Sequence, residues 1–407
     1  MRPVEGSNVL LCVTGGIAAF KAVQLLRLLT KAGAQVRVVM TEAATRFVGP
    51  TTFEALSGRP VATDLFPTSG AGGESHIALT DWADIIVVAP ATANALARAA
   101  LGLAPDLLGC VLLAARCPVV MAPAMHTAMY RHPATRSHLD TLDARGIHLV
   151  PVGEGDLASG AGEGRMAEPS QIFETIAGVL SPKDLEGIRV LVTAGPTREP
   201  IDPVRHISNR SSGKMGYALA RTAARRGARV VLVSGPVALE VPTGVECVSV
   251  RTAREMAREV HARYADMDAV VMAAAVADYT PKQVAKHKIK KTGGPMTLEL
   301  EPTEDILASL GKRRAGSGAT RPVLVGFAME TEALEANARA KLARKGCDFI
   351  VANDISAPGV GFEYDTNQVT ILSSSGQVVP LPLMSKEDVA SALLDRVAAH
   401  LRGGHEG

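Results

Sequence analysis

Residues 8–40 read NVLLCV TGG IAAFKAVQLLRLLTK AGA QVRVVM, and this stretch decides the fold. Residues 8–13 form a short apolar run typical of a buried strand, and Gly15-Gly16 follows it as a turn. Apolar residues then recur at helical spacing over 17–31, and 35–40 is again apolar and β-branched. The stretch therefore predicts a βαβ unit with two parallel strands.

The same alternation of strand and helix patterns returns further along the chain. Strand-like runs lie at 85–89, 119–122 and 147–150, with helical segments such as 98–115 between them. Strands that alternate with helices favour a parallel sheet with helices on both faces. We expect the first half of the chain to form one doubly wound sheet.

A polar stretch, SPKDLEG at 181–187, interrupts this pattern with proline and glycine. Strand and helix patterns then restart at 189–193 and 214–226. The sequence therefore predicts an α/β protein with two doubly wound parallel-sheet domains, 1–180 and 188–407, and a linker at 181–187. Near the end, two strand-like runs around a Ser-Ser-Gly turn predict a hairpin at 368–381.

Composition excludes several classes of protein. The 407 residues are 47% hydrophobic and 21% charged with a net charge of +2, so the chain can bury large cores but offers no basic field for nucleic acid. The longest apolar stretch, 109–125, is interrupted by Arg116 and Pro118, which disfavours a membrane helix. Five cysteines without C-x-x-C spacing fit a reducing compartment. We expect a cytoplasmic protein.

Polar side chains in the first half follow the ends of predicted strands. Gly15 and Gly16 precede a helix, so backbone N–H groups and the helix dipole converge where a phosphate could bind. Thr41, Thr92 and Asn94 follow two other strands, at the edge where parallel sheets bind ligands. This arrangement predicts a nucleotide or flavin site, although a tight turn without a ligand would also explain the glycines.

The first half also carries a resemblance to a known family. The motifs are GGIAAFK at 15–21, MTEAA at 40–44, HI at 76–77, WAD at 82–84 and APAM at 122–125. They resemble the homo-oligomeric flavin-containing cysteine decarboxylases, in which this half is phosphopantothenoylcysteine decarboxylase. The resemblance implies a flavodoxin-like fold, FMN at a trimer interface, and a catalytic role for His76.

The chemistry of that family explains its need for a flavin. Loss of CO2 from a cysteine carboxylate leaves a carbanion without an electron sink, and oxidation of the C–S unit by FMN creates one. Two positions depart from the family pattern. His126 replaces the asparagine that holds the substrate carboxylate, and an imidazole can still donate to a carboxylate. Ser159 replaces a proton-donating cysteine, and a hydroxyl is a weaker acid than a thiol.

The second half contains an unusually long polar loop, AGPTREPIDPVR at 194–205 followed by ISNRSSGKMG at 207–216. Long polar loops are commonly functional, and Arg205 with the serines could clamp an anion, although helix capping alone would also explain the serines. With AAAVADY at 273–279 and GFAMET at 326–331, the loop resembles the signature of phosphopantothenate-cysteine ligases. We expect a Rossmann-like domain here.

The ligase resemblance implies roles for individual residues. Asn209 would act in turnover of an acyl-cytidylate, Arg205 would lie at the substrate end, and Mg²⁺ would be held mainly by the CTP phosphates. The residues implied in CTP binding are Ala273, Ala274, Ala275, Asp278, Lys288, Glu304, Asp305, Ile306, Leu307, Phe327, Lys341 and Lys345. The family's Asn-Pro-Asp-Ile reads Thr303-Glu304-Asp305-Ile306 here.

Two lysine patterns in this half can be interpreted from the residues alone, without the resemblance. The basic run 282–291 could be a solvated face, or a mobile lid that places Lys288 over a triphosphate. Lys341 and Lys345 are spaced i,i+4, so a helix would place both ammonium groups on one face, where a bound anion would relieve their repulsion.

Together the two resemblances imply a bifunctional enzyme that ligates cysteine to 4'-phosphopantothenate with CTP and then decarboxylates the product on FMN. The family implies a dodecamer built from trimers of the first domain and dimers of the second, with small-molecule partners only. Three alternatives stay open: a ligase whose first half is only a scaffold, a nicotinamide-dependent reductase, which lacks G-x-G-x-x-G here, and a non-catalytic regulatory subunit.

Overall fold

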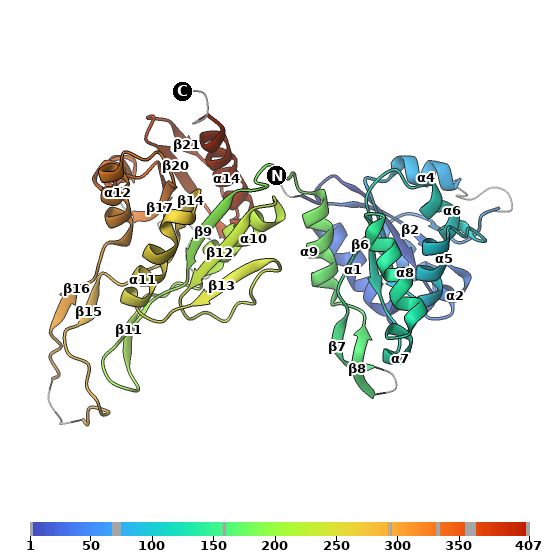
Figure 1. Cartoon of the computed structure of the whole chain (residues 1–407), viewed down its shortest axis with the longest axis horizontal. Coiled ribbons are helices and arrows are strands. Elements are labelled where there is room, and N and C mark those ends of the chain that lie inside the picture. The colour runs from blue at the N-terminus through green and yellow to red at the C-terminus, as the bar shows by residue number, and fades with distance from the viewer. Residues whose placement is uncertain are drawn as a thin grey trace. The chain divides into compact units, whose positions relative to one another are not determined.

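The computed structural model describes residues 3–66, 75–157, 160–291, 293, 295–330, 334–354 and 364–403. The chain divides into two compact units, Arg2–Ser181 and Pro182–Gly407 (Figure 1). Each unit contains its own main sheet and its own hydrophobic clusters. No helix in the described part of the chain is long and apolar enough to cross a membrane.

The first unit is built on a six-stranded parallel sheet with the order β3-β2-β1-β4-β5-β6. Its edge strand β3 has two residues, and without it the order β2-β1-β4-β5-β6 is that of the flavodoxin fold. The prediction of a flavodoxin-like first domain is confirmed. The strands are β1 (Asn8–Val13), β2 (Gln35–Met40), β3 (Val61–Ala62), β4 (Ile85–Ala91), β5 (Val119–Pro123) and β6 (His148–Leu149).

Helices cover both faces of this sheet because its strands are apolar on both sides. Along β1, Val9 and Leu11 join one buried cluster with α1 and α9, whereas Leu10 and Cys12 join another with α5, α6 and α8. The helices are α1 (Ala19–Lys31), α2 (Glu42–Thr45), α3 (Pro50–Ser57), α4 (His76–Trp82), α5 (Ala93–Leu101), α6 (Leu107–Ala114), α7 (Thr127–Tyr130), α8 (Pro133–Ala144) and α9 (Pro169–Leu180).

One predicted element of the first unit is wrong. The expected helical segment at 98–115 is two helices, α5 and α6. Gly102 ends α5 in the left-handed conformation, and Asp106 begins α6 by accepting a hydrogen bond from the Gly109 N–H at 2.9 Å. A separate antiparallel ribbon, β7 (Gly153–Leu157) with β8 (Gly160–Arg165), follows the sheet.

The second unit has an eight-stranded sheet with the order β13-β12-β9-β14-β17-β18-β20-β21. Its first six strands are parallel and follow the 3-2-1-4-5-6 order of the Rossmann fold, which confirms the predicted class. The predicted hairpin is the antiparallel pair β20–β21. The strands are β9 (Arg189–Ala194), β12 (Arg229–Ser234), β13 (Val245–Ser249), β14 (Ala269–Met272), β17 (Val323–Glu330), β18 (Phe349–Asp354), β20 (Val369–Ser373) and β21 (Val378–Pro380).

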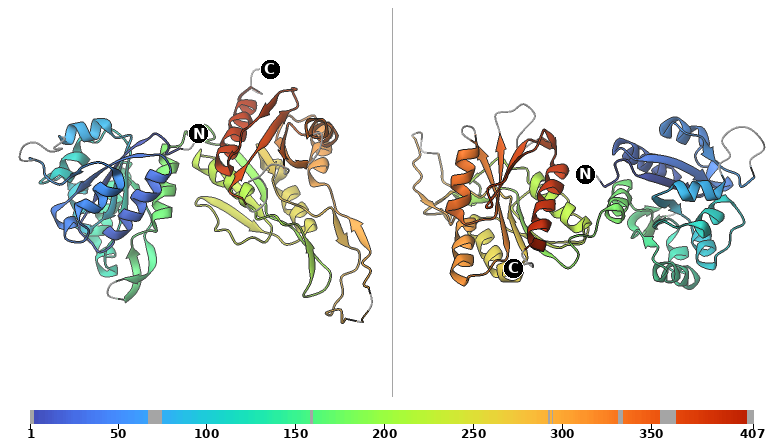
Figure 2. Two further views of the ribbon diagram at one scale, coloured as in Figure 1. Left: turned by 180° about the vertical axis from the view of Figure 1, so that it is seen from behind. Right: turned by 90° about the horizontal axis from the view of Figure 1, so that it is seen from above.

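Helices also pack on both faces of the second sheet (Figure 2). One cluster joins α10 and α14 to the sheet, and the other joins α11, α12 and α13. Gly216 lets α10 approach β9 closely, because an added Cβ would lie 2.5 Å from the Ala194 Cβ. The helices are α10 (Lys214–Arg225), α11 (Ala253–Arg263), the 3₁₀ turn η1 (Tyr264–Asp266), α12 (Ile306–Ser317), α13 (Leu334–Lys345) and α14 (Lys386–Gly403).

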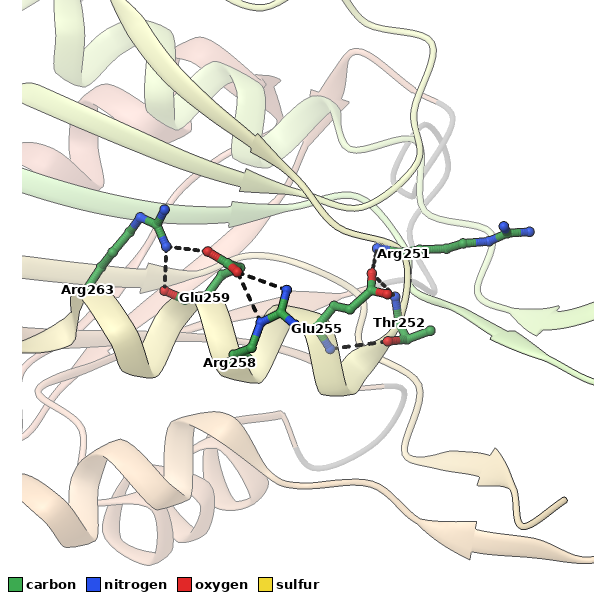
Figure 3. A network of polar contacts seen from close by, with 6 residues as sticks. All are labelled: Arg251, Thr252, Glu255, Arg258, Glu259 and Arg263. Atoms are coloured by element: carbon green, nitrogen blue, oxygen red, sulfur yellow. Dashed lines mark hydrogen bonds and ion pairs between the residues drawn. The ribbon is translucent and has the colours of Figure 1, made fainter. Parts of the chain in front are cut away.

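Polar contacts fix the start and the outer face of α11 (Figure 3). Thr252 Oγ1 accepts a hydrogen bond from the Glu255 N–H at 3.2 Å, and the Glu255 carboxylate accepts one from the Arg251 N–H at 2.6 Å. Glu259 forms ion pairs with Arg258 and Arg263 one turn further on. This capping box begins the helix after β13, at the C-terminal end of the sheet.

Three two-stranded ribbons complete the second unit. They are β10 (Arg198–Pro200) with β11 (His206–Ser208), β15 (Tyr279–Pro281) with β16 (Leu300–Pro302), and β19 (Thr366–Asn367) with β22 (Met384–Ser385). The first two ribbons project from the sheet as arms (Figure 1). They contact each other where the Ala285 N–H donates to the Ile201 carbonyl at 3.0 Å.

Candidate active sites

A cavity of about 1590 Å³ lies at the carboxyl ends of β1, β2, β4 and β5 in the first unit. All five residues predicted to bind the cofactor line it: Gly15, Gly16, Thr41, Thr92 and Asn94. Their convergence follows from topology, because parallel strands end at one edge of a sheet. The switch point of the sheet, between β1 and β4, lies at this edge.

The turn after β1 is shaped by close packing and by one threonine. A Cβ on Gly15 would lie 2.5 Å from the Ala43 Cβ, so a side chain there would push the β1 turn away from α2. The buried Thr14 Oγ1 donates to the Pro90 carbonyl at 2.7 Å and accepts from the Thr92 N–H at 3.3 Å. These bonds hold the ends of β1 and β4 together.

Two threonine hydroxyls at this edge begin short helices. Thr41 Oγ1 accepts from the Ala44 N–H at 3.3 Å, and Thr92 Oγ1 accepts from the Ala95 N–H at 3.4 Å. A hydroxyl that accepts in this way can donate its own hydrogen to a ligand. The glycine turn, the hydroxyl donors and the size of the cavity suit a flavin with a phosphate tail.

A buried lysine at the same cavity was not predicted as a site residue. Lys21 of α1 is 5% exposed, and its Nζ donates to the Met166 carbonyl and to Glu168 Oε1, both at 3.0 Å. Arg165 pairs with the same carboxylate at 3.0 Å. The sequence did contain a signal for this residue, because a lysine occupies one of the apolar positions of an amphipathic helix.

His126 lines the cavity and begins α7. Its Nδ1 accepts a hydrogen bond from the Ala128 N–H at 3.1 Å, so the neutral ring carries its proton on Nε2. His76, the first residue of α4, is half-buried and is not among the described residues that line this cavity. The predicted donor Ser159 lies outside the described residues.

A second cavity, of about 510 Å³, lies within the second unit at the carboxyl ends of its parallel strands. Asn209 lines it, together with all but one of the residues predicted to bind CTP. Those lining residues are Ala273, Ala274, Ala275, Asp278, Glu304, Asp305, Ile306, Leu307, Phe327, Lys341 and Lys345.

Buried threonines support the loop after β14, which forms one wall of this cavity. Thr193 Oγ1 accepts from the Ala274 N–H at 3.1 Å, and Thr197 Oγ1 accepts from the Ala277 N–H at 3.0 Å. Asn209 Nδ2 donates to the Ala275 carbonyl at 3.0 Å. The main chain of the loop is therefore held in place before any ligand binds.

Acidic and basic side chains together line this cavity. Asp305 begins α12 and lies 3.4 Å from Lys345 Nζ. Lys341 and Lys345 come from α13 and both line the cavity, as their spacing predicts. Burial opposes ionisation of Glu304, but hydrogen bonds, chiefly from His261 at 2.7 Å, bring the net pKa of Glu304 below its ordinary value.

Two predicted residues do not line the second cavity. The Arg205 guanidinium binds the buried Asp202 carboxylate, with Nε–Oδ2 at 3.0 Å and Nη2–Oδ2 at 2.6 Å. This pair holds the pKa of Asp202 well below its usual range. Lys288 belongs to a segment that packs on the β10–β11 arm, where the Ile289 N–H donates to Asp202 Oδ2 at 3.1 Å.

Sequence reasoning also missed several lining residues of the second cavity. Lys214, Asn353, Asn367 and Lys386 lie at its wall and come from four different elements. No role was predicted for any of the four, although Lys214 lies in the loop 207–216 that carries the ligase resemblance. Within the described residues, no group of three or more His, Cys, Asp or Glu side chains is placed to hold a metal ion.

The fold and the two cavities define a two-domain enzyme class, with a flavodoxin-like unit that suits a flavin and a Rossmann-like unit with a lysine-lined cleft that suits a nucleotide. Comparisons with known proteins identify the family. Residues 2–181 match the Flavoprotein family, and residues 185–401 match the DNA/pantothenate metabolism flavoprotein C-terminal domain.

Curated relatives cover both halves. The coenzyme A biosynthesis bifunctional protein CoaBC of Bacillus subtilis is 50% identical over 401 residues, which span 97% of this chain and 98% of the relative. The CoaBC protein of Mycobacterium tuberculosis is 49% identical over 410 residues, with 97% of each chain covered. The chain belongs to the CoaBC family of coenzyme A biosynthesis bifunctional proteins, and it is an enzyme of that pathway. This membership removes the reductase and the non-catalytic alternatives.

Solved structures resemble each half separately. The C-terminal domain of a coenzyme A biosynthesis bifunctional protein CoaBC is 43% identical, with a TM-score of 0.47, and covers 54% of this chain and 99% of its own. The FMN-dependent cysteine decarboxylase SpaF is 34% identical, with a TM-score of 0.38, and covers 44% of this chain and 97% of its own.

Proposed function

We propose that the second unit joins cysteine to 4'-phosphopantothenate at the expense of CTP and that the first unit then decarboxylates the product with FMN. The observation that carries this proposal is the second cavity, where Asn209 lies among eleven of the twelve residues that the ligase resemblance implies in CTP binding. Each reaction is assigned to the unit that contains the matching cavity.

Ligation needs an activated carboxylate, because oxide is a poor leaving group at neutral pH. CTP would supply cytidylate as the activating group, and pyrophosphate would leave with Mg²⁺ sharing its charge. Lys341 and Lys345 would stabilise negative charge on the nucleotide. Asn209, fixed on the Ala275 carbonyl, would orient the acyl-cytidylate for attack by the cysteine amine.

In the first unit, FMN would supply the oxidising chemistry that creates an electron sink beside the substrate carboxylate. Gly15, Thr41 and Thr92 would hold the phosphate and ring of the cofactor through main-chain and hydroxyl donors. His126 would donate from Nε2 to the substrate carboxylate, because its Nδ1 already accepts the Ala128 N–H.

His76 and Ser159 complete the proposed decarboxylase residues. The position of His76 outside the cavity supports the idea that it acts on a substrate bound to a neighbouring subunit, as a trimer of first units would allow. Ser159 would serve as the proton donor. Dimers of second units would then link such trimers into a dodecamer.

A single reaction mixture tests the proposal. Purified protein with CTP, Mg²⁺, 4'-phosphopantothenate and carboxyl-labelled cysteine should release pyrophosphate, CMP and labelled CO2 in equal amounts. Pyrophosphate without CO2 would mean that the first unit is only a scaffold. Absence of any cysteine amide would exclude the ligase.

A further inference from the structure

A buried lysine of the first unit has no role in the reaction proposed above. Lys21 lies on α1 and is 5% exposed, although lysines are rarely buried unless they are paired. Its Nζ donates to the Met166 carbonyl and to Glu168 Oε1, both at 3.0 Å. Two of the three ammonium hydrogens are therefore used by a segment that lies 145 positions further along the chain.

The acceptors of Lys21 lie at the base of the β7–β8 ribbon. Arg165 is the last residue of β8, and its Nη2 pairs with the same Glu168 oxygen at 3.0 Å. The Glu168 N–H donates to Gln171 Oε1 at 3.1 Å, which fixes the main chain of Glu168 at the start of α9. We call Lys21, Arg165 and Glu168 the ribbon anchor, because together they join α1 to the end of the ribbon.

Strand β8 lies directly against the segment that carries His126. The Met125 N–H donates to the Gly164 carbonyl at 3.0 Å, and a Cβ on Gly164 would lie 2.5 Å from the Met125 carbonyl oxygen. A Cβ on Gly162 would lie 2.2 Å from Thr127 Oγ1. The two glycines let the strand approach this segment closely, so a displacement of β8 would displace His126 as well.

Core packing does not require a lysine at this position. Met166 and Ala167 belong to the same buried cluster as the apolar residues of α1. Burial of an ammonium group costs free energy that a methionine of similar volume would avoid. The ion pair adds direction instead, because the ammonium reaches the Met166 carbonyl and the Glu168 carboxylate together only when the end of the ribbon is correctly placed.

We infer that Lys21 is a positioning residue for the decarboxylation. It fixes the base of the β7–β8 ribbon, and the ribbon in turn fixes His126 against the substrate carboxylate. This inference rests on the proposed decarboxylase function. The alternative role for Lys21 is a direct contact with the flavin, because Lys21 also lines the first cavity and has one hydrogen left to donate.

Replacing Lys21 tests the anchor. CO2 release from 4'-phosphopantothenoylcysteine by full-length Lys21→Met should show a kcat lowered about tenfold to hundredfold, the loss expected when a reacting group is misplaced by about 1 Å. The Kd for FMN and the rate of pyrophosphate release should stay unchanged. Lys31→Met, at the exposed end of the same helix, is the charge-matched control and should keep the wild-type kcat.

Replacing Glu168 removes the other charge of the ion pair. Glu168→Gln should lower kcat by a smaller factor than Lys21→Met, because its amide oxygen still accepts a hydrogen bond from the ammonium. The Glu168 side chain is 50% exposed, so this variant provides the same test if Lys21→Met does not fold. An unchanged kcat in both variants would overturn the inference.

Hydrogen exchange of the FMN-loaded protein separates the two roles of Lys21. The Met125 amide, which donates to the Gly164 carbonyl, should exchange about tenfold faster in Lys21→Met than in the wild type, while the amides of β4 should keep their rates. A weaker Kd for FMN with unchanged exchange at Met125 would assign Lys21 to the cofactor and overturn the inference. If the wild type releases no CO2, the proposed function fails, whereas the exchange rates still test the anchor.

Discussion

Lys386 keeps an ammonium group where burial and Lys214 both disfavour it, so its pKa of about 8 lies below the value of 10.5 expected in the unfolded chain. The folded protein therefore binds this proton more weakly than the unfolded protein. Below pH 8 the lysine is protonated in both states, so the folded protein bears the full free-energy cost of the buried charge. As the pH rises from 8 to 10.5 this cost disappears and the free energy of unfolding increases.

This linkage predicts a pH dependence that the Lys386→Met variant should lack. Between pH 7.5 and 10.5 the free energy of unfolding of the wild type should rise relative to the variant by about 1–2 kcal/mol, after allowance for solvent screening. Urea unfolding of both proteins at several pH values measures the difference. If the free energies of unfolding of the two proteins change in parallel with pH, the lowered pKa of Lys386 is contradicted.

His126 combines a structural and a chemical role at one residue. Its Nδ1 begins α7, and its Nε2–H is left for the cavity. We expect His126→Ala to lower the rate of CO2 release about tenfold or more, whereas His126→Asn, which can both cap the helix and donate, should recover to within about threefold. Pyrophosphate release should stay normal in both variants. CO2 release at the wild-type rate by His126→Ala would contradict the proposed contact between His126 and the substrate carboxylate.

At the scale of elements, threonines at strand ends control the loops that line the second cavity. Thr193→Val keeps the shape of the side chain but removes the acceptor for the Ala274 N–H, which costs about 1–3 kcal/mol. We expect the KM for CTP to rise about tenfold. Stopped assays of pyrophosphate release at varied CTP concentration measure this change.

Thr222 of α10 provides the matched control for that substitution. It is also buried, but its Oγ1 has no hydrogen-bond partner among the described residues. Thr222→Val should therefore leave the KM for CTP unchanged and should not lower stability. Equal effects of the two substitutions would mean that the loop does not depend on the Thr193 hydroxyl.

Elements and local motifs were predictable because their signals lie close together in the sequence. The glycine turn after β1, the two doubly wound sheets and the i,i+4 lysines of α13 follow from periodicity and from the alternation of strand and helix patterns. The helix predicted at 98–115 failed because Gly102 and Asp106 end one helix and begin the next within five residues. Helix caps of this kind outweigh apolar periodicity.

Four lining residues of the second cavity, Lys214, Asn353, Asn367 and Lys386, could not be predicted in this way. These four residues are separated by up to 172 positions in the chain, and no role was predicted for any of them, although Lys214 lies in a loop that carries the ligase resemblance. Arg205 shows the opposite error. Its place in a polar loop suggested an anion clamp, but Asp202, three residues away, provides a buried carboxylate that binds the guanidinium.

At the scale of the whole molecule, each unit contains its own main sheet, its own clusters of buried residues and one of the two cavities described above. We expect residues 182–407 expressed alone to fold and to release pyrophosphate with CTP, cysteine and 4'-phosphopantothenate. Residues 2–181 alone should bind FMN and turn yellow. Circular dichroism and absorbance measure both outcomes, and an unfolded 182–407 fragment would show that its fold needs the first unit.

The salt bridge between Asp202 and Arg205 has a mechanical consequence. Asp202 Oδ2 also accepts a hydrogen bond from the Ile289 N–H, and Arg205 Nη2 donates to the Ile289 carbonyl at 3.1 Å. The salt bridge therefore joins the two projecting arms at Ile289. Lys288 is next to Ile289 in one arm, and Asn209 is four residues beyond Arg205 in the other. The salt bridge therefore ties the segment that carries Lys288 to the β10–β11 arm, whereas Asn209 is tied to the loop after β14 by its hydrogen bond to the Ala275 carbonyl.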